Sequence, residues 1–242
     1  MAFSMFCAIP GPLHIWDSKC FNLVLPFFPF IGGIIGAVWW GVFRVLMLTE
    51  IDPMPASAIV ALLPFAVSGF LHLDGYMDTS DAVFSRRPLE EKLRILKDPH
   101  TGSFAVIMLA VLFVLQFSAA YTIIEKKIFL KLLIGIPIIS RCCSAISILC
   151  LKTIEQSSLA KMFRENSGIQ HKVSIIFVLV LAVVFTCRYA GYSGLIVSAA
   201  VITGFTAALA YSYKNLKGVS GDLAGFGLVI GELCGLFAMA AV

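Results

Sequence analysis

Residues 103–124 read SFAVIMLAVLFVLQFSAAYTII, a run of 22 residues without a single charged side chain. A helix that crosses a bilayer needs about 20 consecutive, mostly apolar residues, and this run meets that requirement. The other candidate spans are 24–46, 56–72, 129–151, 173–187, 191–213 and 222–242. Because 56–72 and 173–187 are short for full crossings, seven spans is the best count, and six or eight stay open.

The composition of the whole chain points the same way. Of its 242 residues, 60% are hydrophobic and 13% are charged, whereas about a quarter of the residues of a soluble protein are charged. This composition excludes a soluble enzyme and a disordered chain. It also excludes a nucleic-acid binder, because the net charge of +4 is small and spread along the chain. We therefore expect an all-α, polytopic integral membrane protein, with residues 1–242 forming a single domain in the lipid bilayer.

Two further segments are predicted to lie along the membrane surface. Residues 1–20 are apolar but interrupted by Pro10, Gly11 and Pro12, which favours a surface segment over a crossing. Residues 85–103 read SRRPLEEKLRILKDPHTGS. Leucines on one side and charges on the other predict a short interfacial helix that begins near Pro88 and ends near Asp98.

The basic residues predict which side of the membrane each loop faces. With seven alternating crossings, residues 73–102, 152–172 and 214–221 lie on one side and hold eleven Lys and Arg residues. The opposite side holds four, namely Lys126, Lys127, Lys131 and Arg188. Cytoplasmic loops carry the excess of Lys and Arg. We therefore expect the first set, joined by Lys19, to be cytoplasmic in the cell membrane, with the C-terminus outside.

Acidic residues are scarce, and three of them fall together in GFLHLDGYMDTSDAVFSRR, residues 69–87. Asp74, Asp78 and Asp81 are spaced i, i+4 and i+7, so on a helix their carboxylates share one face. Like charges on one face repel unless a cation lies among them, and ligands that are all oxygen suit Mg²⁺ or Mn²⁺. The alternative is a solvated helix end at the membrane surface. His72 precedes the cluster and is expected to point elsewhere.

Four other charged residues also stand out, and two of them, Asp222 and Arg87, allow two interpretations each. Arg141 and Glu232 lie near the middle of apolar spans at equal nominal depth, which predicts a buried ion pair. Asp222 follows Gly221 and either caps the last helix or supplies a fourth carboxylate. Arg87 is suited to gripping phosphate oxygens, but ordinary cytoplasmic positive charge explains it equally well.

These residues resemble a known signature. The matching block consists of His72-Leu73-Asp74-Gly75, Asp78-Thr79, Asp81, Asp98 and Gly102, and it is similar to that of the adenosylcobinamide-GDP ribazoletransferase, or cobalamin synthase, family. Further matches are Phe28-Pro29, Gly32, Gly36, Ser140-Arg141, Gly221-Asp222 and Gly231-Glu232. The resemblance therefore covers nearly the whole chain.

The resemblance implies the joining step of the cobalamin nucleotide loop. In this family a ribose hydroxyl of α-ribazole, or of its 5′-phosphate, attacks adenosylcobinamide-GDP; GMP leaves and a phosphodiester forms, with Mg²⁺ required. It implies a cytoplasmic active site in which Asp74, Asp78, Asp81 and Asp222 hold Mg²⁺. One of the first three, or Asp98, would accept the proton of the attacking hydroxyl. The residues expected to contact substrate are Arg87, Lys97, Gly102, Arg141 and Glu232.

Two other functions compete with this one. The CDP-alcohol phosphotransferases also place aspartates at helical spacing around Asp-Gly, but they carry Ala-Arg shortly afterwards, where this chain has Tyr76-Met77. A transporter would line its pathway with intramembrane charges, yet the sequence shows no repeated halves. The sequence leaves the oligomeric state open, and a homo-oligomer is allowed.

Overall fold

The computed structural model describes residues 1–10, 18–49, 51–126, 130–155 and 157–242. Helices dominate it, and within these residues the only strand-like pairing is an isolated bridge between Thr153 and Val219. The helices are α1 (Ala2–Phe6), α2 (Val24–Leu46), α3 (Pro53–Val67), α4 (Leu71–Phe84), α5 (Leu89–Ile95), α6 (Ser103–Lys126), α7 (Leu132–Cys150), α8 (Ser158–Glu165), α9 (Ile169–Ala190), α10 (Tyr192–Leu216) and α11 (Gly221–Ala241), with a 3₁₀ turn η1 (Ser18–Leu23) before α2.

Six helices in the described part are long and apolar enough to cross a membrane, and α3 with α4 makes a seventh span if the bent pair is counted once. The six are α2 with the end of η1, α6, α7, α9, α10 and α11. This confirms a polytopic helical protein and six of the predicted spans to within a few residues. The short helix predicted to begin near Pro88 is α5, which begins one residue after Pro88 and ends at Ile95.

The segment predicted as the span 56–72 is not one continuous helix. The helix ends at Val67, and the axes of α3 and α4 differ by 92°. Gly69 has φ +65°, and the N–H groups of Gly69 and Phe70 donate to the carbonyls of Ala66 and Phe65. This is the Schellman arrangement, in which glycine takes the left-handed position that ends a helix. The chain therefore turns inside the bundle and starts α4 in a new direction.

α3 is anchored because Pro64 lies within it. Proline has no N–H, so the carbonyl of Val60, one turn earlier, has no donor within the helix. The indole N–H of Trp39 on α2 donates to that carbonyl at 2.7 Å. The amide of Gln116 on α6 donates to the next carbonyl, that of Ala61, at 3.0 Å. Side chains from two neighbouring helices therefore hold α3 in place.

The bundle has an enclosed centre and an exposed rim. α7 and α11 are mostly buried, whereas α6 and α9 expose most of their length, as expected for helices that face lipid. α2 approaches α7 so closely that a Cβ at Gly36 would lie 2.7 Å from the Ile134 backbone. Small residues at such crossings allow helices in a membrane to pack tightly.

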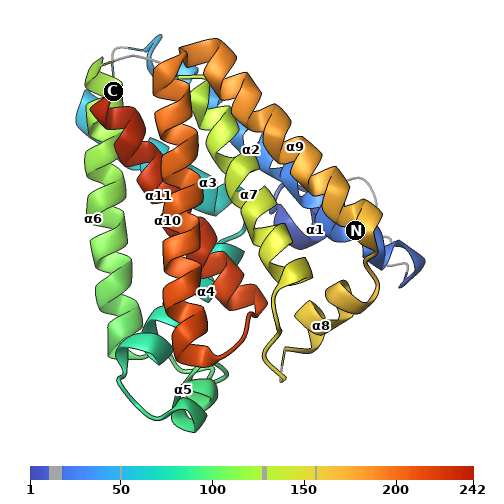
Figure 1. Cartoon of the computed structure of the whole chain (residues 1–242). Helices are drawn as coiled ribbons and strands as arrows, with labels where there is room; N and C mark the ends of the chain where they lie inside the picture. Colours follow the sequence, from blue (N-terminus) through green and yellow to red (C-terminus); the bar gives the residue numbers. More distant parts are fainter. Residues whose placement is uncertain (11–17, 50, 127–129, 156) are drawn as a thin grey trace.

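The loops sort to two ends of the bundle (Figure 1). α5, α8 and the turn between α10 and α11 lie at the lower end, and the C-terminus lies at the upper end. Lys126 Nζ donates to the Ala240 carbonyl at 2.6 Å, so the end of α6 also lies at the C-terminal end. The loops rich in Lys and Arg thus share one end of the molecule.

Part of the segment expected on the membrane surface packs into the bundle instead. Phe6 and Cys7 are buried, and the N–H of Ala8 donates to the carbonyl of Val67 at 2.8 Å. α1 therefore fills the angle where α3 ends. Residues 11–17, in the middle of the predicted segment, lie outside the described part of the chain.

Candidate active site

α4 presents three aspartates along one helix, as the spacing predicted. Asp74 in its first turn is exposed, while Asp78 and Asp81 are half-buried. Tyr76, on another side of the helix, is buried and donates its hydroxyl to the Met108 carbonyl of α6 at 3.1 Å. α4 is thus fixed against the bundle on its apolar side and leaves its carboxylates on the other.

α11 brings a fourth carboxylate to this helix. A Cβ at Gly75 would lie 2.8 Å from the Cα of Asp222, so only glycine permits this crossing of α4 and α11. Ser220 caps α11, because its Oγ accepts from the Leu223 N–H at 3.3 Å. Of the two readings of Asp222, the structure therefore favours the fourth carboxylate over the helix cap.

The four carboxylates concentrate negative charge. The negative charges of Asp74, Asp222 and Asp81 each repel the charged form of the Asp78 carboxyl. The charge of Asp74 also repels the charged form of the Asp222 carboxyl. None of the ion pairs in the described residues includes any of the four. Such repulsion is relieved by a cation or by protonation.

The four carboxylates do not already form a metal cage. No three His, Cys, Asp or Glu side chains in the described residues are placed so that they could jointly hold a metal ion. The donors are carboxylate oxygens that take part in none of the ion pairs of the described residues, which fits Mg²⁺ in type and charge. Asp222 Oδ2 accepts one hydrogen bond, from Ser220 Oγ at 3.2 Å. The donor chemistry therefore fits, and coordination would require the aspartate side chains to turn toward a common point.

Gly102 lies directly against Asp81. A Cβ at position 102 would come within 2.0 Å of Asp81 Oδ2. Gly102 begins the approach to α6, so the loop after α5 passes over the end of the aspartate row. The predicted substrate contact is thus placed where it sets the position of a carboxylate, and its contact with substrate stays a prediction.

Two cavities meet at Asp222. The first has a volume of about 240 Å³ and includes Lys97, three serines and Asp222 in its lining; it is lined by Leu96, Lys97, Ile154, Ser157, Ser158, Leu159, Ser220, Gly221 and Asp222. The second has a volume of about 210 Å³ and is lined by Met5, Phe6, Leu25, Phe28, Leu71, His72, Ser144, Ile148, Leu159, Ala160, Phe163, Gly221 and Asp222. We call them the polar cavity and the apolar cavity. Leu159, Gly221 and Asp222 line both, so the two are adjacent.

Of the basic residues proposed for phosphate, Lys97 lines the polar cavity with Asp222. Arg87 is exposed on the turn before α5 and lines neither cavity. Asp98 is also exposed. The backbone N–H of His100 donates to it at 2.9 Å and the His100 ring pairs with it at 2.7 Å, which lowers the pKa of its carboxyl. A lowered pKa makes Asp98 a weaker proton acceptor than an ordinary aspartate.

Arg141 and Glu232 form the predicted buried ion pair. Both side chains are almost completely buried, and Ser140 Oγ also donates to Glu232 Oε1 at 2.7 Å. The pair joins α7 to α11 in the bundle interior and lines neither cavity. The proposed role of these two residues in substrate binding stays a prediction.

The chain matches the family model described as cobalamin-5-phosphate synthase over residues 1–240. The chain belongs to this family. An adenosylcobinamide-GDP ribazoletransferase of Clostridium botulinum (strain Alaska E43 / Type E3) is 38% identical over 98% of this chain and 94% of its own. The protein of the same name from Clostridium perfringens (strain 13 / Type A) is 38% identical over 100% of this chain and 96% of its own. That of Lachnoclostridium phytofermentans is 32% identical over 96% of this chain and 89% of its own. No solved structure gives a significant match.

Membership in the synthase family makes this chain a transferase of cobalamin biosynthesis, which excludes both competing functions. The family signature did not reveal three contributors to the cavities: Ser157, Ser158 and Leu159. They lie at the start of α8, and no spacing pattern links them to the aspartates. Only the return of the chain between α7 and α9 brings them there.

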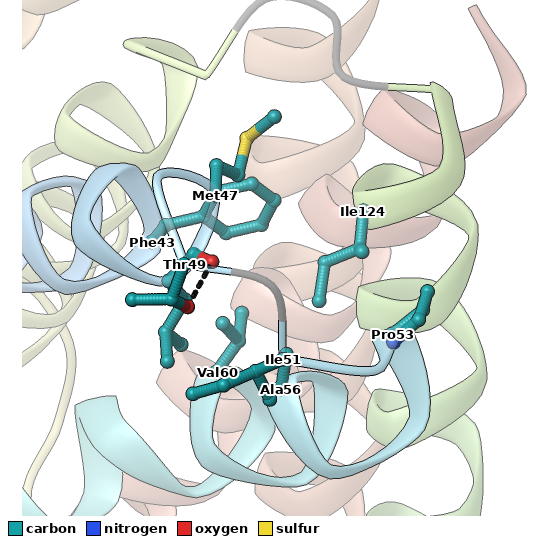
Figure 2. Close-up of a pocket in the computed structure, with 9 residues that line it drawn as sticks. Phe43, Met47, Thr49, Ile51, Pro53, Ala56, Val60 and Ile124 are labelled. Atoms are coloured by element: carbon teal, nitrogen blue, oxygen red, sulfur yellow. Dashed lines mark hydrogen bonds between the residues drawn. The ribbon is translucent and has the colours of Figure 1, made fainter.

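A third pocket lies apart from these two cavities, between the end of α2, the start of α3 and α6 (Figure 2). Phe43, Val60 and Ile124 point into it, and Thr49 Oγ donates to the Leu46 carbonyl at 2.7 Å. None of its lining residues is charged. It shares no lining residue with the two cavities at Asp222, and its lining has no positively charged side chain that could bind a phosphate.

Proposed function

We propose that this protein joins adenosylcobinamide-GDP to α-ribazole, or to α-ribazole 5′-phosphate, at the cytoplasmic face of the cell membrane. The observation that carries the proposal is the crossing at Gly75, which sets Asp222 beside the three aspartates of α4. The names of the relatives supply the reaction, and the site supplies a concentration of acceptor oxygens with Lys97 nearby.

The reaction exchanges the phosphoanhydride bond of the diphosphate for a new phosphate ester bond. The hydroxyl oxygen of the ribose attacks the phosphorus that remains with the corrinoid, and the bond from that phosphorus to the GMP oxygen breaks. The proton of the hydroxyl passes to a carboxylate, for which the half-buried Asp78 and Asp81 are better placed than exposed, hydrogen-bonded Asp98. Lys97 would bind a phosphate oxygen in the polar cavity.

Mg²⁺ would be held by Asp74, Asp78, Asp81 and Asp222, where it supplies charge neutralisation on the diphosphate. The support is the unpaired negative charge of these residues. Gly102 keeps the end of the row open, because any side chain there would occupy the space of the Asp81 carboxylate.

The test is GMP release from adenosylcobinamide-GDP and α-ribazole by membranes that contain the protein, with Mg²⁺ and then with EDTA. We expect release that EDTA abolishes and that Asp78→Asn lowers about 100-fold or more, because loss of a metal ligand costs several kcal/mol of transition-state stabilisation. Asp52→Asn, at the start of α3, is the matched control and should behave as wild type.

Two outcomes would overturn parts of the proposal. Near-normal turnover and Mg²⁺ dependence in Asp78→Asn would remove the metal assignment but leave the reaction. Absence of GMP release from folded wild-type protein would remove the reaction itself.

A further inference from the structure

One residue that lines the apolar cavity has a buried polar atom that the reaction described above does not use. His72 is 8% exposed, and its Nε2 has no hydrogen-bond partner among the described residues. A buried ring nitrogen left without a partner destabilises the folded protein. Buried polar atoms of this kind generally have a partner that comes from a ligand or from water.

The walls around His72 are aromatic. The centroid of the His72 ring lies 5.5 Å from that of Phe28 and 6.1 Å from that of Phe6. The ring centroids of Phe6 and Phe28 are 4.4 Å apart. These three residues come from α1, α2 and α4, three separate helices that meet at one cavity. Aromatic rings in such groups favour a flat, aromatic neighbour by stacking or edge contacts.

The remaining lining explains what the cavity would exclude. Apart from His72, its polar side chains are those of Ser144 and Asp222, and all the others are apolar or glycine. Guanine carries several donors and acceptors on its edges, and a mostly apolar lining suits a ring with fewer hydrogen-bonding groups better. A corrinoid ring is far larger than a cavity of about 210 Å³. A bicyclic, mostly apolar ring with one hydrogen-bonding atom agrees with both the size and the lining.

We propose that the apolar cavity binds the aromatic base of the attacking nucleoside and that His72 Nε2 hydrogen-bonds to the unsubstituted ring nitrogen of that base. This inference rests on the proposed function. The base of α-ribazole is a substituted benzimidazole, which is flat, bicyclic and mostly apolar. Its one free ring nitrogen accepts a hydrogen bond, and the tautomer of His72 with the proton on Nε2 donates it.

The position of the cavity suits this role. Asp222 lines both cavities, so a base in the apolar cavity would direct its ribose toward Asp222 and the carboxylates of α4. The other substrate would bring its diphosphate to the polar cavity and Lys97. α8, which supplies Leu159 and Ala160, lies below α1 beside the lower end of α7 (Figure 1). His72 is thus a binding residue for one substrate only.

The experiment compares His72→Phe with wild type in the GMP-release assay. Phenylalanine keeps the ring and the packing but removes the hydrogen bond. We expect the KM for α-ribazole to rise about tenfold, as loss of one hydrogen bond predicts, with the KM for adenosylcobinamide-GDP unchanged. His72→Gln, which restores a donor, should recover part of the affinity for α-ribazole.

A binding measurement separates this inference from the reaction. Benzimidazole should bind to the purified wild-type protein without Mg²⁺ or adenosylcobinamide-GDP, and about tenfold more weakly to His72→Phe. His171→Phe is the matched control, because His171 is also 8% exposed but lies at the start of α9 and lines neither cavity. It should bind benzimidazole as wild type does.

An equal rise of both KM values, or unchanged benzimidazole binding in His72→Phe, would overturn the inference while the proposed function stands. Failure of wild-type protein to release GMP would overturn the proposed function, whatever benzimidazole does.

Discussion

Single atoms set the geometry of the carboxylate row. Gly75 permits the backbone of Asp222 to reach α4, and Gly102 permits the loop after α5 to pass over Asp81. In the first case a methyl group would meet backbone atoms, which move only if the helices separate. In the second it would meet the end of a flexible side chain, which can turn away. The two glycines therefore act on the site in different ways.

Gly102→Ala should lower turnover by up to about 100-fold with little loss of stability, because the added methyl group displaces the Asp81 carboxylate by an ångström or more. Turnover at saturating substrates and the thermal unfolding midpoint would be measured together. Gly41→Ala is the control, since nothing lies within 4 Å of a Cβ there. Normal turnover in Gly102→Ala would show that the placement of Asp81 against Gly102 does not matter for the reaction.

Helices α7 and α11 are the buried elements that support the site from the bundle interior. Both are enclosed by other helices, and their one ion pair lies where water does not reach. The Arg141 side chain also packs against Gly32 of α2: a Cβ added at that glycine would lie 2.7 Å from Arg141 Cδ. The pair thus connects three helices, and α11 continues from it to Asp222.

Glu232→Leu alone should destabilise the protein by about 3 to 5 kcal/mol, because it leaves the Arg141 guanidinium buried without its partner. The double variant Arg141→Met with Glu232→Leu should be more stable than Glu232→Leu alone. Unfolding free energies of the four proteins in the cycle measure the coupling between the two residues. Additive effects would show that the pair does not act as a unit.

At the scale of the whole molecule, the bent pair α3–α4 places the aspartates near one end of the bundle. α3 begins beside the end of α6, because Pro53 and Ile124 line the same pocket. α4 ends beside α5, at the opposite end (Figure 1). Taken as one broken span, the pair gives seven crossings and agrees with the uneven distribution of Lys and Arg.

A labelling experiment would test the orientation. Tyr192→Cys lies on the exposed turn between α9 and α10, and Lys161→Cys lies on exposed α8 at the opposite end. In a background without the native cysteines, a membrane-impermeant maleimide should label Tyr192→Cys on intact cells. Lys161→Cys should react only after the cells are opened. The reverse pattern would place the aspartates outside the cell.

The sequence by itself determined the membrane class, six spans, the helical spacing of Asp74, Asp78 and Asp81, and the pairing of Arg141 with Glu232. Each of these follows from local periodicity or from the high cost of a lone charge in an apolar span. The family was also readable, because its signature falls largely within one helix, α4, and the loop that follows it.

Only the tertiary structure decided the bend at Gly69, the approach of Asp222 to α4 and the cavity at His72. A glycine in an apolar run either continues a helix or ends it, and here the Schellman hydrogen bonds and the packing of α1 favour the end. Residues 72 and 222 are far apart in the chain, so no local pattern joins them. They meet because α11 crosses α4 at a glycine, where two backbones can touch.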